Sequence, residues 1–428
     1  MKQVVEKGKT LLVDGPASVT LLSGETEILG AYFKPSSKMV IREGKRVPFL
    51  IKEKAEFDLL LGEKAAATEF ETNTIPQSWE NAINTILNQK TEPLIVMIVG
   101  GIDSGKTSFC TYLANKTLKE KRKVAIIDAD LGQADVGPPS TIGSCRITKP
   151  IRDPFEIGAE NICFIGVTSP SSAATKVVEA IAKMKDKVLK RAVSVLIINT
   201  DGWIEGEDAI RYKLSLIKQV KPDVLIGIQE QNELTFLLGA VTETQKMPIE
   251  SSPAVRKRDR EERKLLREIG YKKYLKGAAL ESFPISWVKV SGLPLGNGSA
   301  PSRERIAKIV EQIGTTPIYA EETSTSVFIV LGRQQWADEE IAISIGDALN
   351  KKVKIVWQGD EEGLLVALHD KEENFLGLGV LEQIDYERRV FKVYTRVRKD
   401  VASIHVGQIK LDKSGKELGQ SEAFSDYI

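Results

Sequence analysis

Hydrophobic positions change their spacing along the chain, and these changes divide it into three predicted regions. Up to about residue 75, short apolar segments alternate with turn signals such as D-G and E-G-K. Short strands separated by such turns are typical of a small all-β domain. Residues 79–88 then have the periodicity of a helix, which leads the chain into the next region.

From about residue 94 to residue 290, apolar runs alternate with segments of helical periodicity. The predicted strands cover residues 94–99, 124–128, 162–167, 194–199 and 224–229. The predicted helices cover residues 107–121, 172–190 and 206–221. Nearly continuous apolar strands are typical of parallel sheets that are buried on both faces. The pattern therefore predicts a doubly wound, mostly parallel α/β core, which binds ligands at the carboxyl ends of its strands.

A Gly-, Pro- and Ser-rich stretch at 293–302 and a predicted helix at 303–314 separate this core from a third region. Strand-like runs resume there at 326–331, 352–357, 364–369, 376–382 and 389–397, which predicts a second β-rich domain and allows a barrel. The predicted divisions are an N-terminal β domain at 1–75, the α/β core at 76–292, a linker and helix at 293–315, and a C-terminal β-rich domain at 316–428.

Composition limits the cellular compartment and the kinds of chemistry that we expect of the protein. No apolar run approaches the ~20 residues of a membrane span, and the first ten residues lack the apolar core of a signal peptide, so we expect a cytoplasmic protein. Three cysteines without paired spacing indicate a reducing compartment. The two histidines lie far along the chain from the strongest motif, so neither a histidine nucleophile nor a zinc site is expected. A net charge of +1 means that any contact with nucleic acid must be local.

That motif is G-G-I-D-S-G-K-T at 100–107, which matches the phosphate-binding loop (P-loop) pattern between a predicted strand and a predicted helix. Its glycines let the backbone wrap a phosphate, and its N–H groups point inward at the start of the helix. Lys106 can reach the β- and γ-phosphates, and the Thr107 hydroxyl can hold Mg²⁺. The predicted nucleotide contacts are Gly101, Ile102, Asp103, Ser104, Gly105, Lys106, Thr107 and Ser108.

Two aspartates follow the second predicted strand of the core, in the string D-A-D-L-G-Q. Asp128 and Asp130 are placed at a carboxyl strand end beside the P-loop. One carboxylate there can hold a water of Mg²⁺, and the other can accept a proton from an attacking hydroxyl. Residues i and i+2 of a strand share a face, so both could point into one site. The alternative is a pair of ordinary turn aspartates.

Three further features each leave two interpretations open. Gln133 could contact substrate or stabilise its own loop. Trp203 follows another strand end, where its indole could stack on a nucleobase or fill the core. The charged run at 255–273 could be a solvated helix or a mobile lid near 252–275 whose arginines close over the phosphoryl group.

Together these strings resemble the polynucleotide 5′-hydroxyl kinase family of RNA processing. That family includes archaeal polyribonucleotide kinases, the kinase-like subunit of the pre-mRNA cleavage complex and nucleolar rRNA-processing kinases. The matching strings are the P-loop, D-A-D-L-G-Q at 128–133, G-V-T-S-P at 166–170, I-N-T-D-G-W at 198–203 and the Arg-rich segment around 255–275. The order of the domains is similar too, so the resemblance spans nearly the whole chain.

The resemblance implies a role for each matching residue. Lys106 would act on the phosphates, Asp130 would be the general base, and Asp128 would assist Thr107 at the metal. Trp203 would clamp the terminal base of the acceptor strand. A clasp on the nucleotide or acceptor strand would contain Thr168 or, alternatively, Thr175. The lid arginines would be Arg258 and Arg263, with Arg256 and Arg260 as the alternatives. Glu27 would contact the adenine, which the N-terminal domain would cover.

The expected activity is ATP-dependent phosphorylation of the 5′-hydroxyl of RNA, with DNA as a further acceptor and with ATP and Mg²⁺ as cofactors. Two alternatives remain at this stage. One is a scaffold that holds ATP without turnover and recruits RNA-processing partners. The other is a regulatory NTPase switch that uses water as its nucleophile.

Overall fold

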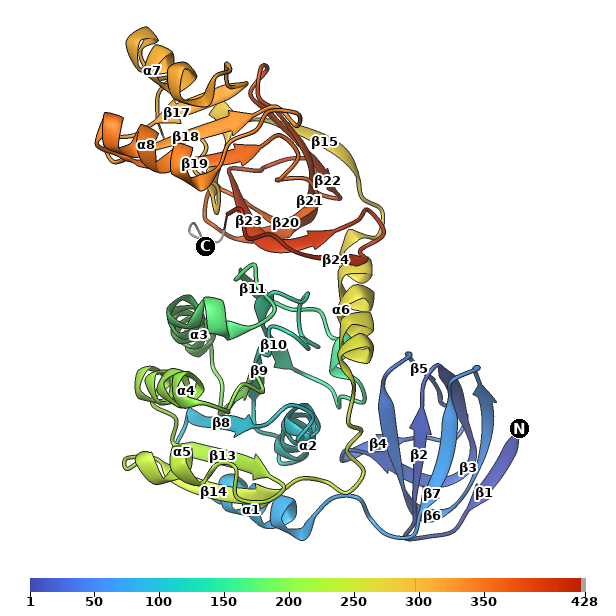
Figure 1. Ribbon diagram of the computed structural model, residues 1–428. Coiled ribbons are helices and arrows are strands. Elements are labelled where there is room, and N and C mark those ends of the chain that lie inside the picture. The colour runs from blue at the N-terminus through green and yellow to red at the C-terminus, as the bar shows by residue number, and fades with distance from the viewer. Residues whose placement is uncertain (297, 425–428) are drawn as a thin grey trace. The chain divides into compact units, whose positions relative to one another are not determined.

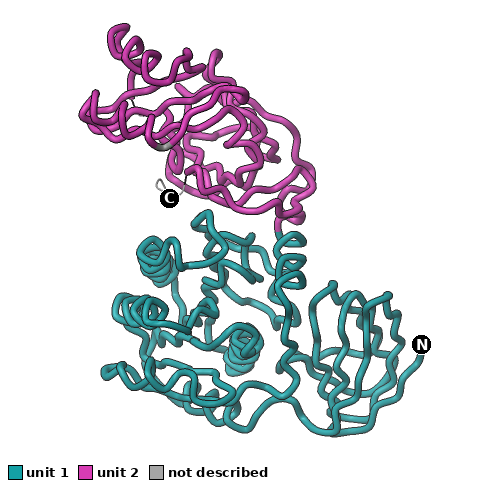
Figure 2. Tube along the Cα trace, in the orientation of Figure 1, with its two compact units in different colours: residues 1–270 teal, residues 271–428 magenta. Residues whose placement is uncertain are grey.

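The computed structural model describes residues 1–296 and 298–424, and the chain divides into two compact units, residues 1–270 and 271–428 (Figure 2). The first unit contains an N-terminal β-sheet and an α/β core, and the second contains two further sheets (Figure 1). Among the described residues, no helix combines the length and the apolar character needed to cross a membrane.

The N-terminal sheet has seven antiparallel strands, and its central path is β4-β3-β6-β2-β7. The strands are β1 (Lys2–Val5), β2 (Thr10–Asp14), β3 (Ala17–Ile28), β4 (Ala31–Phe33), β5 (Lys38–Ile41), β6 (Arg46–Leu61) and β7 (Ala66–Phe70). Buried and exposed positions alternate along β3 and β6, which places one face of each strand in the core. Phe33, Phe49 and Phe57 make edge-to-face contacts within that core.

The α/β core contains one seven-stranded sheet in the order β11-β10-β9-β12-β8-β13-β14. Its strands are β8 (Leu94–Gly100), β9 (Val124–Ala129), β10 (Thr141–Ile147), β11 (Asn161–Phe164), β12 (Val195–Thr200), β13 (Val224–Gln229) and β14 (Gln245–Glu250). Its helices are α1 (Gln77–Leu87), α2 (Lys106–Lys119), α3 (Ala174–Leu189), α4 (Glu207–Val220) and α5 (Thr235–Ala240). Helices cover both faces of the sheet, with α1 and α2 on one side and α3, α4 and α5 on the other (Figure 1).

Five of these strands are parallel neighbours, whereas β10 runs antiparallel to both β9 and β11. All residues of β9 and β12 are buried, as expected for central parallel strands. The sequence pattern did not predict β10 or β14. β14 is mostly exposed and contains Pro248, which an edge strand tolerates, so it lacks the apolar run that marks the central strands.

A long helix, α6 (Arg260–Leu275), follows the core, and the second unit begins within it, at residue 271. The larger sheet of the second unit has the order β15-β22-β21-β20-β23-β16, with β24 paired to β23. Its strands are β15 (Ala279–Pro284), β16 (Lys289–Ser291), β20 (Leu364–His369), β21 (Phe375–Asp385), β22 (Val390–Thr395), β23 (Ser403–Leu411) and β24 (Glu417–Gln420). β15 and β16 join this sheet, although the sequence analysis groups their residues with the α/β core.

The smaller sheet of the second unit has the order β17-β18-β19 and packs with two helices. These elements are β17 (Tyr319–Glu322), β18 (Ser326–Leu331), β19 (Lys352–Trp357), α7 (Arg303–Ile313) and α8 (Glu339–Leu349). The sequence analysis missed α8 because its stretch I-A-I-S-I alternates like a strand. The second unit is therefore rich in β-structure but also contains a small α/β subdomain.

Candidate active site

The P-loop connects β8 to α2, so its backbone N–H groups lie at the N-terminus of a 14-residue helix. Gly100 is required at the strand end, because a Cβ there would lie 2.6 Å from the Ile228 carbonyl oxygen. Lys106, the first residue of α2, folds back so that its Nζ donates to the Gly101 carbonyl at 2.6 Å and to the Gly100 carbonyl at 3.1 Å. The lysine thus hydrogen-bonds to the backbone of its own loop.

The ammonium group of Lys106 is buried, and burial lowers its pKa. The nearby carboxylates of Asp130 and Asp201 act in the opposite direction, and the positive charge of Lys213 lowers the pKa further. A buried cation is costly without a partner of opposite charge. The site is therefore prepared for an anion that can replace the two loop carbonyls.

Asp128 joins three structural elements around the P-loop. Its Oδ2 accepts hydrogen bonds from the backbone N–H groups of Asp135 at 2.8 Å and Val136 at 3.0 Å. Its Oδ1 accepts from Asn199 Nδ2 at 3.0 Å, and the same Nδ2 lies 3.3 Å from Thr107 Oγ1. Burial raises the pKa of Asp128 to about 7. Asn199 was not predicted as a site residue, although it lies within the string I-N-T-D-G-W at the end of β12.

Asp130 lies just beyond the end of β9 and is oriented by its own loop. Its Oδ1 accepts from the backbone N–H groups of Gln133 at 3.0 Å and Gly132 at 3.2 Å. Burial raises its pKa, and the positive charge of Lys106 opposes that change. Because the strand ends at Ala129, the two aspartates do not share a strand face as the i, i+2 spacing predicts. Asp128 fixes the loop and contacts Asn199, whereas Asp130 interacts electrostatically with Lys106.

The lid segment is held by the P-loop itself. Asp103 accepts from Arg258 Nη1 at 2.7 Å and from the Arg258 backbone N–H at 2.9 Å, and Arg263 Nη1 lies 3.6 Å from the same carboxylate. Arg256 instead forms ion pairs with Asp14 and Glu262. Arg258 and Arg263 are thus brought to the P-loop, and Arg256 is not.

Gln133 and Thr168 lie at the edge of the same site. Gln133 Nε2 donates to the Gly132 carbonyl at 2.6 Å and to the Arg263 carbonyl at 3.2 Å, so its amide connects the Asp130 loop to the lid. A Cβ at Gly132 would lie 3.0 Å from the Thr168 carbonyl oxygen, which places that residue beside the same loop. The rival residue Thr175 is exposed in the first turn of α3.

Trp203 is positioned by a buried ionic network. Asp201 Oδ1 accepts from the Trp203 backbone N–H at 2.9 Å, and Asp201 Oδ2 accepts from Tyr212 and Lys213 at 2.7 and 2.9 Å. The Trp203 indole stacks on the Tyr212 ring, with centroids 5.6 Å apart and planes inclined by 24°. Gly202 allows this turn to approach the P-loop, because a Cβ there would lie 2.8 Å from Ile102 Cα. The indole is only half-buried.

The structure does not bring Glu27 to the P-loop. Its carboxylate lies 3.7 Å from Lys119 Nζ and 3.5 Å from Lys52 Nζ. Lys119 is the last residue of α2, and a helix of that length separates its ends by roughly 20 Å. We therefore assign no nucleotide contact to Glu27.

Two neighbouring cavities adjoin the P-loop and share Ser252 and Val255 in their linings. The larger, of about 310 Å³, lies at the carboxyl ends of β13 and β14, where the Gln229 side-chain oxygen is buried without a hydrogen-bond partner among the described residues. The smaller, of about 40 Å³, lies between the N-terminal sheet and α2, and its lining includes Leu12, Pro48 and Ser108. The strand ends thus form a polar, partly enclosed site that extends to the N-terminal sheet.

A parallel sheet, a P-loop with its lysine and hydroxyl, and aspartates at the next strand end define a P-loop nucleotide-binding protein. Residues 100–277 match the family model described as "mRNA cleavage and polyadenylation factor CLP1 P-loop". This match confirms the resemblance indicated by the motifs. A chain in the solved structure of a wild-type Clp1p–Pcf11p (454–563) complex has the same fold, with a TM-score of 0.67 and 14% identity over 96% of this chain and 97% of that one.

Curated relatives extend the similarity beyond the core. A protein of Pyrococcus abyssi named polyribonucleotide 5′-hydroxyl-kinase is 29% identical, and the match covers 81% of this chain and 96% of the relative. A protein of the same name from Methanocaldococcus jannaschii is 26% identical and matches over 81% and 95%. A CLP1 homolog of Culex quinquefasciatus is 26% identical over 67% of this chain and 71% of its own. The predicted fold, an α/β P-loop core between N-terminal and C-terminal β-rich regions, is confirmed.

Lys213→Met should strongly destabilise the protein, because it leaves the buried Asp201 carboxylate without its cation. Removing one partner of a buried pair costs about 3–5 kcal/mol. Urea unfolding of this variant and of Lys218→Met, at an exposed position of the same helix, measures the difference. Equal unfolding free energies for the two variants would contradict the proposed role of the pair.

Proposed function

We propose that this chain transfers the γ-phosphoryl group of ATP to the 5′-hydroxyl end of RNA, with DNA as a further acceptor. The observation that carries the proposal is the carboxylate of Asp130, which its own loop orients just beyond the end of β9 and whose charge interacts with that of the P-loop lysine. A phosphoryl transfer to a neutral alcohol needs a proton acceptor at this place. The names of the archaeal relatives, which match over most of this chain, support the same activity.

The mechanism follows from the positions of the chain's own groups. The 5′-hydroxyl oxygen forms a bond to the γ-phosphorus while the bond from that phosphorus to the β–γ bridging oxygen breaks, and ADP leaves. Asp130 receives the hydroxyl proton. Lys106 exchanges its two loop carbonyls for phosphate oxygens and neutralises their negative charge.

The donors around Asn199 fit a magnesium ion bound with the nucleotide. Thr107 Oγ1 and Asp128 Oδ1 lie near one amide group, and Asn199 Oδ1 is buried without a partner among the described residues. Mg²⁺ prefers such oxygen donors together with water. When bound, it neutralises charge on the β- and γ-phosphates. We assign Thr107 and Asp128 to this role.

The lid arginines can change partners during the reaction. Asp103 holds Arg258 and Arg263 against the P-loop. A triphosphate offers these guanidinium groups more negative charge than one carboxylate does. We propose that both arginines move from Asp103 to the transferring phosphoryl group and stabilise its transition state.

We assign acceptor binding to Trp203, Thr168 and Gln133. Trp203 presents a half-buried indole that Tyr212 supports from one side, which suits stacking on the terminal base. Thr168 and Gln133 lie on adjoining loops, where both would contact the acceptor strand. Gln133 would also hold the closed lid through the Arg263 carbonyl. A scaffold without turnover would need neither a carboxylate that interacts with Lys106 nor a supported indole, so we favour the kinase.

Lys106→Ala and Asp130→Asn should each lower phosphoryl transfer by at least about 100-fold. Lys106→Ala removes the positive charge that stabilises the phosphates, and Asp130→Asn removes the proton acceptor. The assay measures transfer of label from γ-labelled ATP to a short 5′-hydroxyl oligoribonucleotide. Asp130→Asn should still bind ATP. Lys119→Ala, at the exposed far end of α2, is the matched lysine control and should remain active. Activity close to wild type in a folded Asp130→Asn protein would remove the proposed base.

Trp203→Ala should weaken oligonucleotide binding by about 1–3 kcal/mol and lower the melting temperature only slightly, because the indole is half-buried. Trp287→Ala removes an indole that is 78% exposed in the second unit, and it should change neither property. Both quantities are measured on the same preparations. A large fall in melting temperature with unchanged affinity would identify Trp203 as a packing residue.

A further inference from the structure

The only two histidines of the chain, for which the sequence predicts no zinc site, lie side by side in the second unit. His369 ends β20 and His405 lies in the neighbouring strand β23. In this antiparallel pair His369 is opposite Ser403 and Ala367 is opposite His405. The two histidines are therefore diagonal neighbours on one face of the sheet, with ring centroids 4.3 Å apart.

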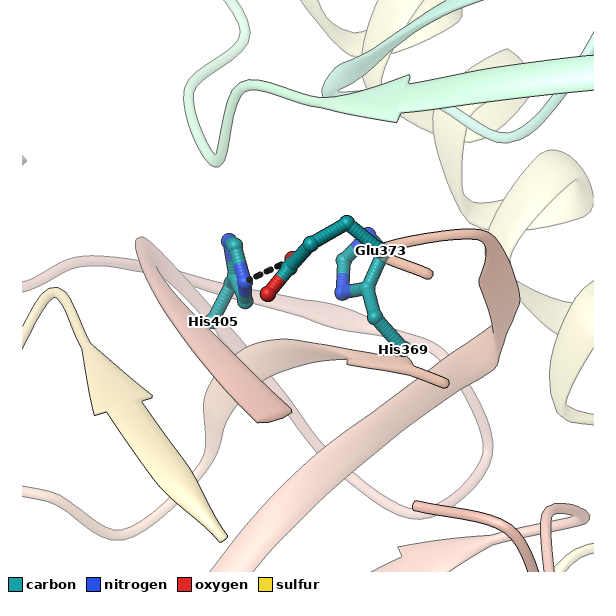
Figure 3. A group of neighbouring side chains, drawn as sticks. All are labelled: His369, Glu373 and His405. Atoms are coloured by element: carbon teal, nitrogen blue, oxygen red, sulfur yellow. Dashed lines mark hydrogen bonds and ion pairs between the residues drawn. The ribbon is translucent and has the colours of Figure 1, made fainter. Parts of the chain in front are cut away.

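A glutamate from a tight turn completes the group. Glu373 lies in the turn between β20 and β21, and Asp370 stabilises that turn by accepting from the backbone N–H groups of Glu372 at 3.0 Å and Asn374 at 2.8 Å. Glu373 Oε2 lies 3.1 Å from His405 Nε2. Figure 3 shows the Glu373 carboxylate beside the imidazole rings of His405 and His369. Three side chains from two strands and one turn thus converge.

The spacing of these groups suits a small cation. One donor atom from each of His369, Glu373 and His405 lies within 4.8 Å of the others. A tetrahedral zinc ion with bonds of about 2.1 Å holds its ligands roughly 3.4 Å apart. The pair formed by His405 Nε2 and Glu373 Oε2, 3.1 Å apart, is already close to this spacing.

The burial of His369 provides an independent observation. This side chain is 5% exposed, and its Nδ1 is buried without a hydrogen-bond partner within the described part of the chain. An unsatisfied buried nitrogen is costly and calls for an explanation. A cation held with Glu373 and His405 would give it a partner. The side chains of those two residues are 54% and 32% exposed, which leaves access for an ion and for water.

We propose that His369, Glu373 and His405 bind a zinc ion that ties the 370–374 turn to β23. Two imidazoles and one carboxylate are typical zinc ligands, whereas Mg²⁺ prefers a set of oxygen donors. Three protein ligands leave a fourth position for water. Ser403 Oγ lies 3.3 Å from Glu373 Oε2 and can hold that carboxylate in place. This site is separate from the P-loop and does not depend on the proposed kinase activity.

Zinc binding is tested on the full, untagged chain, so that no added histidines contribute. The protein is stripped with a chelator, supplied with Zn²⁺ in the presence of excess Mg²⁺, and analysed for bound metal and for affinity by titration calorimetry. The expected result is one Zn²⁺ per chain. Glu373→Gln and His405→Gln should each weaken binding by at least about tenfold. Added Zn²⁺ should also raise the melting temperature of the wild type more than that of either variant.

Glu372→Gln is the matched control, because it lies in the same turn with an exposed side chain outside the cluster. It should bind Zn²⁺ as the wild type does. The proposal is overturned if the wild type binds no stoichiometric Zn²⁺, or if Glu373→Gln and His405→Gln bind it as tightly as the wild type. Equal loss of binding in Glu372→Gln and Glu373→Gln would also overturn it. Circular dichroism of each variant establishes that the fold is retained.

Discussion

The candidate active site depends on one buried carboxylate, Asp128. It accepts hydrogen bonds from the loop that follows β9 and from Asn199 at the end of β12, and Asn199 also reaches the first turn of α2. Burying a carboxylate is favourable only when its oxygens are satisfied, so these contacts fix the loop, the strand end and the helix relative to one another. Asp130 is tied to this arrangement, because its backbone N–H donates to Asp128 Oδ1 at 3.3 Å, and its charge interacts with that of Lys106.

A second buried network supports the acceptor side. Asp201 holds Lys213, Tyr212 and the backbone of Trp203, so the indole is presented by a rigid turn rather than by a flexible loop. The lid is arranged differently, because Asp103 holds its arginines by contacts that a nucleotide can replace. Rigid strand ends and an exchangeable lid are what a phosphotransferase needs in order to exclude water and still release its product.

Much of the fold could be predicted from hydrophobic pattern. Strands such as β13 and β18 have the predicted bounds because they are continuous apolar runs between polar residues. The places of the P-loop, between β8 and α2, and of Asp130, just beyond the end of β9, were predictable because both follow continuous apolar runs, whereas the role of Asp130 stays a prediction. Glu27 and the histidine pair were not, because their surroundings depend on how distant strands and helices pack. Asn199 could have been predicted as a site residue, because it lies in the motif I-N-T-D-G-W at the end of a strand.

Whether the protein transfers phosphate to RNA is tested most directly by asking if ATP is consumed only when the RNA has a 5′-hydroxyl end. ADP and new 5′-phosphate are measured with a 5′-hydroxyl oligoribonucleotide, with the same oligonucleotide already 5′-phosphorylated, and with no RNA. We expect equal amounts of ADP and 5′-phosphate with the first and little ADP in the other two reactions. Equal rates of ADP formation in all three would identify a hydrolytic switch, and bound ATP without ADP formation in any of them would identify a scaffold.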